Sequence, residues 1–191
     1  MCVIIVKPRG VKLPSRELLR KAYRANDDGF GLAYHPKNSK KVIIVKGAMS
    51  FRQAYKIITA VPNPKSCNMV LHFRLATEGK ICPENCHPYP LSNRVGKLRA
   101  TQIDCSVAIA HNGIISIEGQ ENHIGKLEKD LTDTQEFIKN TLSTMGLAVL
   151  NKTVGMLIQE YAGGKFALLA PTKLLLLGSF IKDSTNGLYY S

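Results

Sequence analysis

The chain lacks the long apolar segments that would point to a membrane-spanning protein. Its longest apolar runs are Val3 to Val6 and Leu174 to Leu177, far short of the roughly 20 residues that a bilayer helix needs. No positively charged stretch precedes the first run, so we expect no signal peptide. Five cysteines are an odd number for a disulfide framework. We therefore expect no membrane partner, reduced thiols and a cytoplasmic location.

Acidic residues are also scarce. Lysine and arginine total 26 against 14 aspartates and glutamates, a net charge of +12. Such an excess favours acidic partners, including nucleic acid. The basic residues are scattered, however, with no aromatic interleaving that would indicate a stacking surface for bases. Charge alone therefore names no partner.

Length and apolar content predict one domain. The chain has 191 residues, 45% of them hydrophobic, without internal repeats, low-complexity tracts or a shift in composition. A chain of this size buries one sizeable core. We expect a single domain over residues 1–191.

Apolar patterns and caps predict strands at both ends of the chain and two pairs of helices between strand groups. Helices are expected from Ser15, from Ser50 to about Val61, from Thr132 to about Met145, and over 147–161. Strands are expected over 2–7, 29–34, 42–45, 69–74, 107–111, 166–171, 174–181 and 187–190, with Ile114 and Ile115 resuming a β pattern. A polar, basic loop is expected up to Gln102. The order predicts an α+β fold with two sheets in the middle and helices outside.

Cys2 is the first candidate for chemistry. Once Met1 is removed, Cys2 carries both a thiol nucleophile and a free α-amine. The amine has an ordinary pKa of about 7.7–8.0, suitable for a general base. Nucleophile and base then come from one residue, and a chain that keeps Met1 should be inactive. The alternative is a small buried hydrophobe that opens a strand.

Five phrases follow Cys2 in an informative order. They are Asp28-Gly29-Phe30-Gly31, Arg74-Leu75-Ala76-Thr77, Asn85-Cys86-His87-Pro88, His111-Asn112-Gly113 and Thr132-Asp133-Thr134. Together with Cys2 they resemble the class II glutamine amidotransferases of the N-terminal-nucleophile hydrolase superfamily, in their short, stand-alone form. The resemblance implies a four-layer αββα sandwich. It also implies hydrolysis of an amide through a thioester on Cys2.

The resemblance assigns roles that suit the chemistry of glutamine. Arg74 would grip the α-carboxylate with its two-pronged guanidinium, and Asp133 would hold the α-ammonium. Thr77 would help to hold the substrate or the catalytic loop. Asn112 and Gly113 would form the oxyanion hole. Three of these assignments have a plainer alternative: a solvated arginine for Arg74, an aspartate favoured by a helix dipole for Asp133, and a tight hairpin turn at Asn112-Gly113.

The loop with His87 has two interpretations. Cys82, Cys86 and His87 could ligate zinc with Cys67 or Cys105, but no second well-spaced pair exists. The resemblance instead makes His87 part of a substrate-binding loop, so we expect no metal and no cofactor. His111 is expected to be structural or orienting.

The expected reaction releases glutamate and ammonia from glutamine, with the ammonia passed to a separate synthase partner. One alternative is a γ-glutamyl amidohydrolase acting on a small γ-glutamyl amide. The other is a non-catalytic basic module that binds nucleic acid or an acidic partner. Two positions depart from the family pattern. Val3 follows the nucleophile, where a small or polar residue is common, and Glu78 stands where synthase-linked relatives frequently have a histidine.

Overall fold

The larger of two sheets carries both ends of the chain. A computed structural model describes residues 2–77, 79–115 and 131–191. In these ranges the larger sheet has seven strands in the order β10-β11-β1-β4-β2-β3-β6. They are β1 (Val3–Lys7), β2 (Phe30–His35), β3 (Val42–Ala48), β4 (Asn68–Phe73), β6 (Gln102–Cys105), β10 (Ile181–Lys182) and β11 (Tyr189–Tyr190). The first strand therefore lies inside the sheet, between β11 and β4.

The smaller sheet contains four described strands in the order β5-β7-β8-β9. They are β5 (Tyr89–Pro90), β7 (Ala108–Asn112), β8 (Lys165–Leu169) and β9 (Leu174–Leu177). Every strand pairing in the described ranges is antiparallel. Antiparallel sheets combined with separate groups of helices agree with the predicted α+β class.

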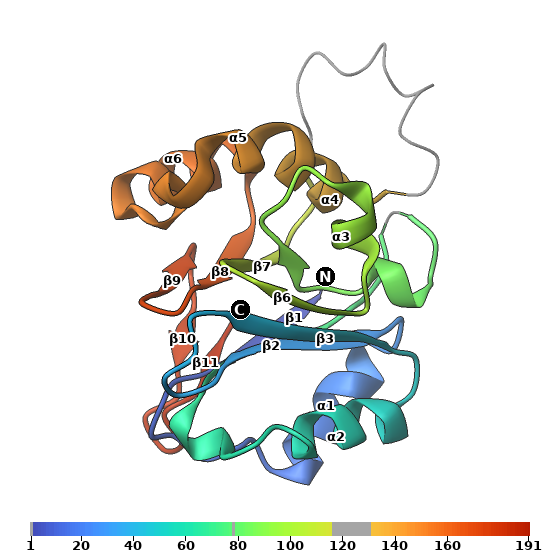
Figure 1. The fold of residues 1–191 in the computed structure, drawn as a ribbon. Coiled ribbons are helices and arrows are strands. Elements are labelled where there is room, and N and C mark those ends of the chain that lie inside the picture. The colour runs from blue at the N-terminus through green and yellow to red at the C-terminus, as the bar shows by residue number, and fades with distance from the viewer. Residues whose placement is uncertain (1, 78, 116–130) are drawn as a thin grey trace.

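Two capped helices cover one face of the larger sheet (Figure 1). They are α1 (Arg16–Ala25) and α2 (Phe51–Thr59). The hydroxyls of Ser15 and Ser50 accept hydrogen bonds from backbone N–H groups three residues later, as their sequence context predicts. Leu19 and Ile58 are buried in one cluster with Leu71 from the sheet. Burial of these apolar faces holds the helices in place.

Small and branched side chains fill the space between the two sheets. The cluster joins Ile4, Val6 and Ala33 of the larger sheet to Ala110 and Ala167 of the smaller one. Alanine at these positions lets the sheets approach closely. The relative position of β1 and β7 is therefore set by tight packing.

A second group of helices covers the other face of the smaller sheet (Figure 1). In order these are α4 (Asp133–Phe137), a π-helical turn η3 (Ile138–Leu142), α5 (Ser143–Met145), a 3₁₀ turn η4 (Gly146–Leu150) and α6 (Lys152–Ala162). Phe137 and Ile158 are buried with Phe166 of the sheet. The helix expected over 147–161 is wrong in its first turn, because Asn151 caps α6 through the N–H groups of Thr153 and Val154.

Other differences from the sequence prediction lie in short elements. The strand expected over 174–181 is two strands in different sheets, with Gly178 at φ +85° between them. The basic stretch before Gln102 contains the short helix α3 (Val95–Arg99), and the strand β6 begins at Gln102. Ile114 and Ile115 are not in a strand. Two 3₁₀ turns, η1 (Pro64–Ser66) and η2 (Pro83–Asn85), complete the described elements.

None of the helices in the described ranges is both long enough and apolar enough to cross a membrane.

Candidate active site

Cys2 stands at the start of β1, opposite the end of β4. The register pairs Val3 with Phe73, which places Cys2 across from Arg74. The Cys2 Sγ atom lies 3.4 Å from both the backbone nitrogen and the carbonyl oxygen of Leu75. The thiol is half-buried rather than enclosed in a core. It is therefore held in one position by backbone groups while part of its surface stays accessible.

The surroundings of Cys2 act on its thiol in opposite directions. Burial raises the pKa of Cys2, since it disfavours the thiolate. A hydrogen bond from the Leu75 backbone and the positive charge of Arg74 lower that pKa but do not outweigh burial. The thiol thus rests protonated and needs a base to become a nucleophile.

Arg74 is fixed at the end of β4 by its own backbone and by its guanidinium. Its N–H donates to the Gly29 carbonyl over 2.8 Å, and its carbonyl accepts from the Asp28 N–H over 3.1 Å. Its side chain is buried, and Nη1 donates to the Lys80 carbonyl over 3.0 Å. Asn85 Nδ2 donates to the same carbonyl over 3.1 Å. Arg74 is not the solvated strand-end arginine of the plainer interpretation.

The turn after Arg74 is shaped by Asp28. The Asp28 carboxylate accepts the Ala76 N–H over 2.8 Å. Thr77 follows on this turn with its side chain exposed. Thr77 therefore lies three residues after Arg74 in sequence, on the solvent-exposed edge of the candidate site.

Asn112 is the last residue of β7, on the smaller sheet. Its side-chain Nδ2 donates to the Ser191 hydroxyl over 2.9 Å, and the same hydroxyl accepts the Ile4 N–H over 2.9 Å. This links Asn112 to the strand that carries Cys2. Asn112 ends β7 and Gly113 follows it; because Ile114 and Ile115 form no strand, the two residues are not a hairpin turn.

Gly113 is packed against a second glycine. A Cβ atom at Gly113 would lie 2.9 Å from the Gly164 Cα and 2.7 Å from His111 Nε2. Carbon atoms do not approach so closely, so only glycine fits here. The His111 ring lies beneath this contact, stacked on Phe166 with ring centroids 4.3 Å apart.

Asp133 is the first residue of α4. Thr132 and Gln135 form the capping box that their spacing predicts. The Asp133 carboxylate accepts the Ile115 N–H over 2.9 Å and the Thr134 N–H over 2.6 Å. The helix start is therefore tied to the segment that follows Gly113.

These contacts join four of the predicted residues into one closed path. Cys2 contacts Leu75, next to Arg74. A side chain at Gly79 would lie 3.8 Å from Arg74 Nη2 and 3.3 Å from the Thr132 methyl, which places the guanidinium near the start of α4. Asp133 connects to Ile115, and Asn112 returns through Ser191 to Ile4.

His87 is buried among other aromatic rings. Its ring is stacked on His72 with centroids 4.3 Å apart and packs against Tyr89 at 4.4 Å. Both ring nitrogens are buried without a hydrogen-bond partner among the described residues. Burial lowers the pKa of His87 well below its ordinary value and that of His72 to about 3. Both histidines are therefore neutral at pH 7 and carry no proton to donate as imidazolium.

Comparison with known families supports the resemblance. A sequence model of the glutamine amidotransferases class-II matches residues 13–136, more than half of the chain. The chain belongs to this family. The matched range includes Arg74, Asn112 and Asp133, and it begins after Cys2. A comparison with curated proteins found no match.

Three contributions to this candidate site escaped prediction. The backbone of Leu75 holds the Cys2 thiol, Asp28 shapes the turn after Arg74, and Ser191 holds Asn112. Asp28 is the first residue of the Asp-Gly-Phe-Gly motif, so the sequence offered a signal for its role. Leu75 acts through its backbone and Ser191 through a contact 79 residues distant in sequence, so neither has a local pattern.

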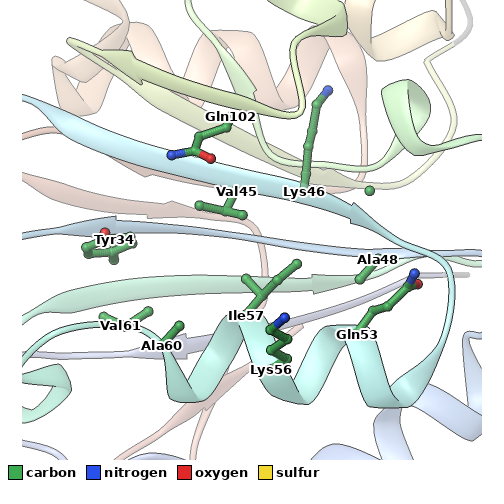
Figure 2. A pocket seen from close by; sticks show the side chains of 11 residues that line it. Tyr34, Val45, Lys46, Ala48, Gln53, Lys56, Ile57, Ala60, Val61 and Gln102 are labelled. Atoms are coloured by element: carbon green, nitrogen blue, oxygen red, sulfur yellow. The ribbon is translucent and has the colours of Figure 1, made fainter.

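A separate groove of about 480 Å³ lies between β3 and α2 (Figure 2). Its wall includes Tyr34, Ile57 and Gln102, and none of the predicted site residues lines it. Figure 2 shows Lys46 pointing away from α2. Its Nζ donates to the carbonyls of Glu84 and Leu98, each over 2.8 Å. The groove therefore lies apart from the candidate active site.

Cysteine and histidine clusters for a metal are not found in the described ranges. All five cysteines are free. No group of three or more His, Cys, Asp or Glu side chains in residues 2–77, 79–115 and 131–191 is arranged to hold a metal ion.

Proposed function

We propose that this chain hydrolyses the side-chain amide of glutamine with Cys2 as the nucleophile, once Met1 has been removed. The observation that carries the proposal is the position of the Cys2 thiol. Its Sγ atom is held 3.4 Å from the Leu75 backbone, half-buried, across from the buried Arg74. A thiol that only filled a core would need neither backbone contact nor a neighbouring cation.

The substrate would be held by its two charged ends. Arg74 offers a planar fork for the α-carboxylate, and the charge-assisted bonds to it are stronger than neutral ones. Asp133 would accept the α-ammonium through Oδ2, which accepts the Ile115 N–H and has a second lone pair, whereas Oδ1 already accepts both the N–H and the hydroxyl of Thr134. Thr77, at the open edge, would contact the substrate, and His87 would support the loop that carries Asn85.

The chemical step needs a base and an oxyanion hole. The Cys2 α-amine takes the thiol proton while Sγ forms a bond to the amide carbon. Asn112 and the Gly113 N–H stabilise the oxyanion. The amine then passes the proton to the departing nitrogen, the C–N bond breaks, and ammonia leaves a thioester. Water cleaves the thioester, which frees the thiol and yields glutamate. The neutral, buried His72 and His87 suit a mechanism that uses no imidazolium.

Three further proposals concern the fold, the fate of the ammonia and the cellular location. The two sheets with helices on their outer faces support a four-layer αββα sandwich of the N-terminal-nucleophile hydrolase type (Figure 1). The ammonia released would pass to a separate synthase, and the five free thiols support work in the reducing cytoplasm.

A glutaminase assay tests the central proposal. Protein whose mass shows that Met1 is absent is given glutamine, and glutamate is measured. Cys2→Ala should abolish turnover, whereas Cys82→Ala should leave it unchanged, since Cys82 is a half-buried thiol outside the site. Processed protein that hydrolyses neither glutamine nor any γ-glutamyl amide would refute the proposal.

The same assay distinguishes two kinds of substrate. Arg74 and Asp133 recognise the glutamyl end, which glutamine shares with γ-glutamyl amides. They therefore do not select the leaving group. A larger kcat/KM for a γ-glutamyl amide than for glutamine would identify the amine, rather than ammonia, as the product of interest.

A further inference from the structure

Ser191 joins the two sheets at the candidate oxyanion hole. It follows β11, which pairs with β1 through Tyr190 and Ile5. Its backbone N–H donates to the Ile4 carbonyl over 3.0 Å, and its Oγ accepts the Ile4 N–H over 2.9 Å. The same Oγ lies 2.9 Å from Asn112 Nδ2 on the smaller sheet. One hydroxyl therefore touches both the strand of the nucleophile and the side chain of the oxyanion donor.

This hydroxyl fixes the plane of the Asn112 amide. Among the described residues, Ser191 is the hydrogen-bond partner of the Asn112 side chain, whose Oδ1 is buried without one. An amide nitrogen carries two hydrogens, so a bond to Ser191 leaves the second hydrogen to donate elsewhere. The Ser191 Oγ atom accepts the Ile4 N–H with one lone pair and Asn112 Nδ2 with the other, so the nitrogen end of the amide faces it.

We propose that Ser191 is a positioning residue that aims the Asn112 amide at the oxyanion. The inference rests on the proposed function of Asn112 and adds a residue to it. Ile4 is two residues from Cys2 and shares the Ser191 hydroxyl with Asn112. Nucleophile and oxyanion donor are thereby kept in register, although they belong to different sheets. Catalytic groups need such alignment to within about 0.5 Å.

Ser191→Ala tests the proposal by kinetics. We expect kcat for glutamine to fall about tenfold with KM within about twofold, because the lost contact acts on the transition state and not on the charged ends of the substrate. Ser191→Thr keeps the hydroxyl and should restore most of kcat. Ser179→Ala, an exposed serine in the same C-terminal region, should match the wild type. An unchanged or increased kcat in Ser191→Ala would overturn the proposal, and an increase would mean that Ser191 obstructs the site.

A double-mutant cycle separates positioning from general stabilisation. If Ser191 acts through Asn112, then adding Ser191→Ala to Asn112→Ala should cost little more than Asn112→Ala alone. Independent, multiplying effects would contradict the proposal.

The contact between Ser191 and Asn112 can also be tested by a measurement that does not depend on enzymatic activity. The side-chain amide signals of Asn112, assigned by their loss in Asn112→Ala, are followed by nuclear magnetic resonance. They should shift and exchange faster with water in Ser191→Ala but not in Ser179→Ala. Unchanged signals would show that the contact does not hold the amide, whether or not the chain hydrolyses glutamine.

Discussion

Replacing Gly113 by alanine should impair catalysis through a displacement that the structure allows us to estimate. The new Cβ would lie 2.9 Å from the Gly164 Cα and 2.7 Å from His111 Nε2. Ordinary contacts begin near 3.4 Å, so a shift of roughly 0.5–0.7 Å is required. Gly164 offers only backbone, and the His111 ring is packed on Phe166. The end of β7 must therefore move.

The expected consequence is a loss of kcat larger than the loss of stability would suggest. A displacement of this size would move the Gly113 N–H away from the oxyanion in the proposed mechanism, and misplacement by about 1 Å costs on the order of 10²-fold. We expect kcat to fall about ten- to a hundredfold, with a smaller change in KM. Overpacking should lower the free energy of unfolding by about 1–3 kcal/mol.

Gly96→Ala is the matched control for this substitution. A Cβ at Gly96 would meet nothing within 4 Å, and Gly96 lies in the short helix α3. Alanine there should leave kcat unchanged and raise the free energy of unfolding by up to about 1 kcal/mol. Glutamate release and urea unfolding would be measured for both variants at a temperature where each is folded. Gly113→Ala with kcat within twofold of the wild type would refute the role given to this backbone.

Three other predictions concern Arg74, the Cys2 thiol and Lys46. Arg74→Lys should raise KM for glutamine about ten- to a hundredfold, because one ammonium cannot replace two guanidinium bonds; an unchanged KM in steady-state kinetics would remove Arg74 from substrate binding. Alkylation of Cys2, followed by mass spectrometry, should reach half its maximal rate above the ordinary thiol pKa of about 8.5, since burial raises the pKa of Cys2; a midpoint at or below that value would contradict this. Burial also lowers the pKa of Lys46 from 10.5 to about 7. The unfolded chain thus binds more protons between pH 7 and 10.5, so the stability of the wild type relative to Lys46→Met should rise with pH in that window by up to about 1.4 kcal/mol per unit. If urea unfolding gave the same pH dependence of the free energy of unfolding for the wild type and Lys46→Met, this prediction would be refuted.

The longer elements could be predicted because their signals are local. Ser15, Ser50 and Thr132 each stand before an apolar pattern with helical spacing, and each caps a helix. Apolar runs such as Val3 to Val6 specify buried strands without reference to distant residues. The edge strand β6 lacked such a signal, because its residues are mostly accessible to solvent and it forms by pairing with β3.

One local cap and one tertiary contact explain two other misses. Residues 147–161 have enough apolar residues for one helix, but Asn151 offers its side chain to two backbone N–H groups and begins a new one. Ile114 and Ile115 have strand-forming side chains, yet the Ile115 N–H is bound by Asp133 instead of a neighbouring strand. Competition between local preference and a distant partner is not visible in a sequence pattern.

The arrangement of the site explains why its residues are so dispersed in sequence. Cys2 and Arg74 meet because β1 and β4 are neighbours in the larger sheet, whereas Asn112 belongs to the smaller sheet. Two sheets packed through alanines can slide against each other only by disturbing a close-packed interface. That interface sets the distance between the proposed nucleophile and the proposed oxyanion donor coarsely, and the Ser191 hydroxyl, bonded to both sides, would set it finely. Precision at the site is therefore a property of how the sheets are joined, and it does not belong to any one motif in the sequence.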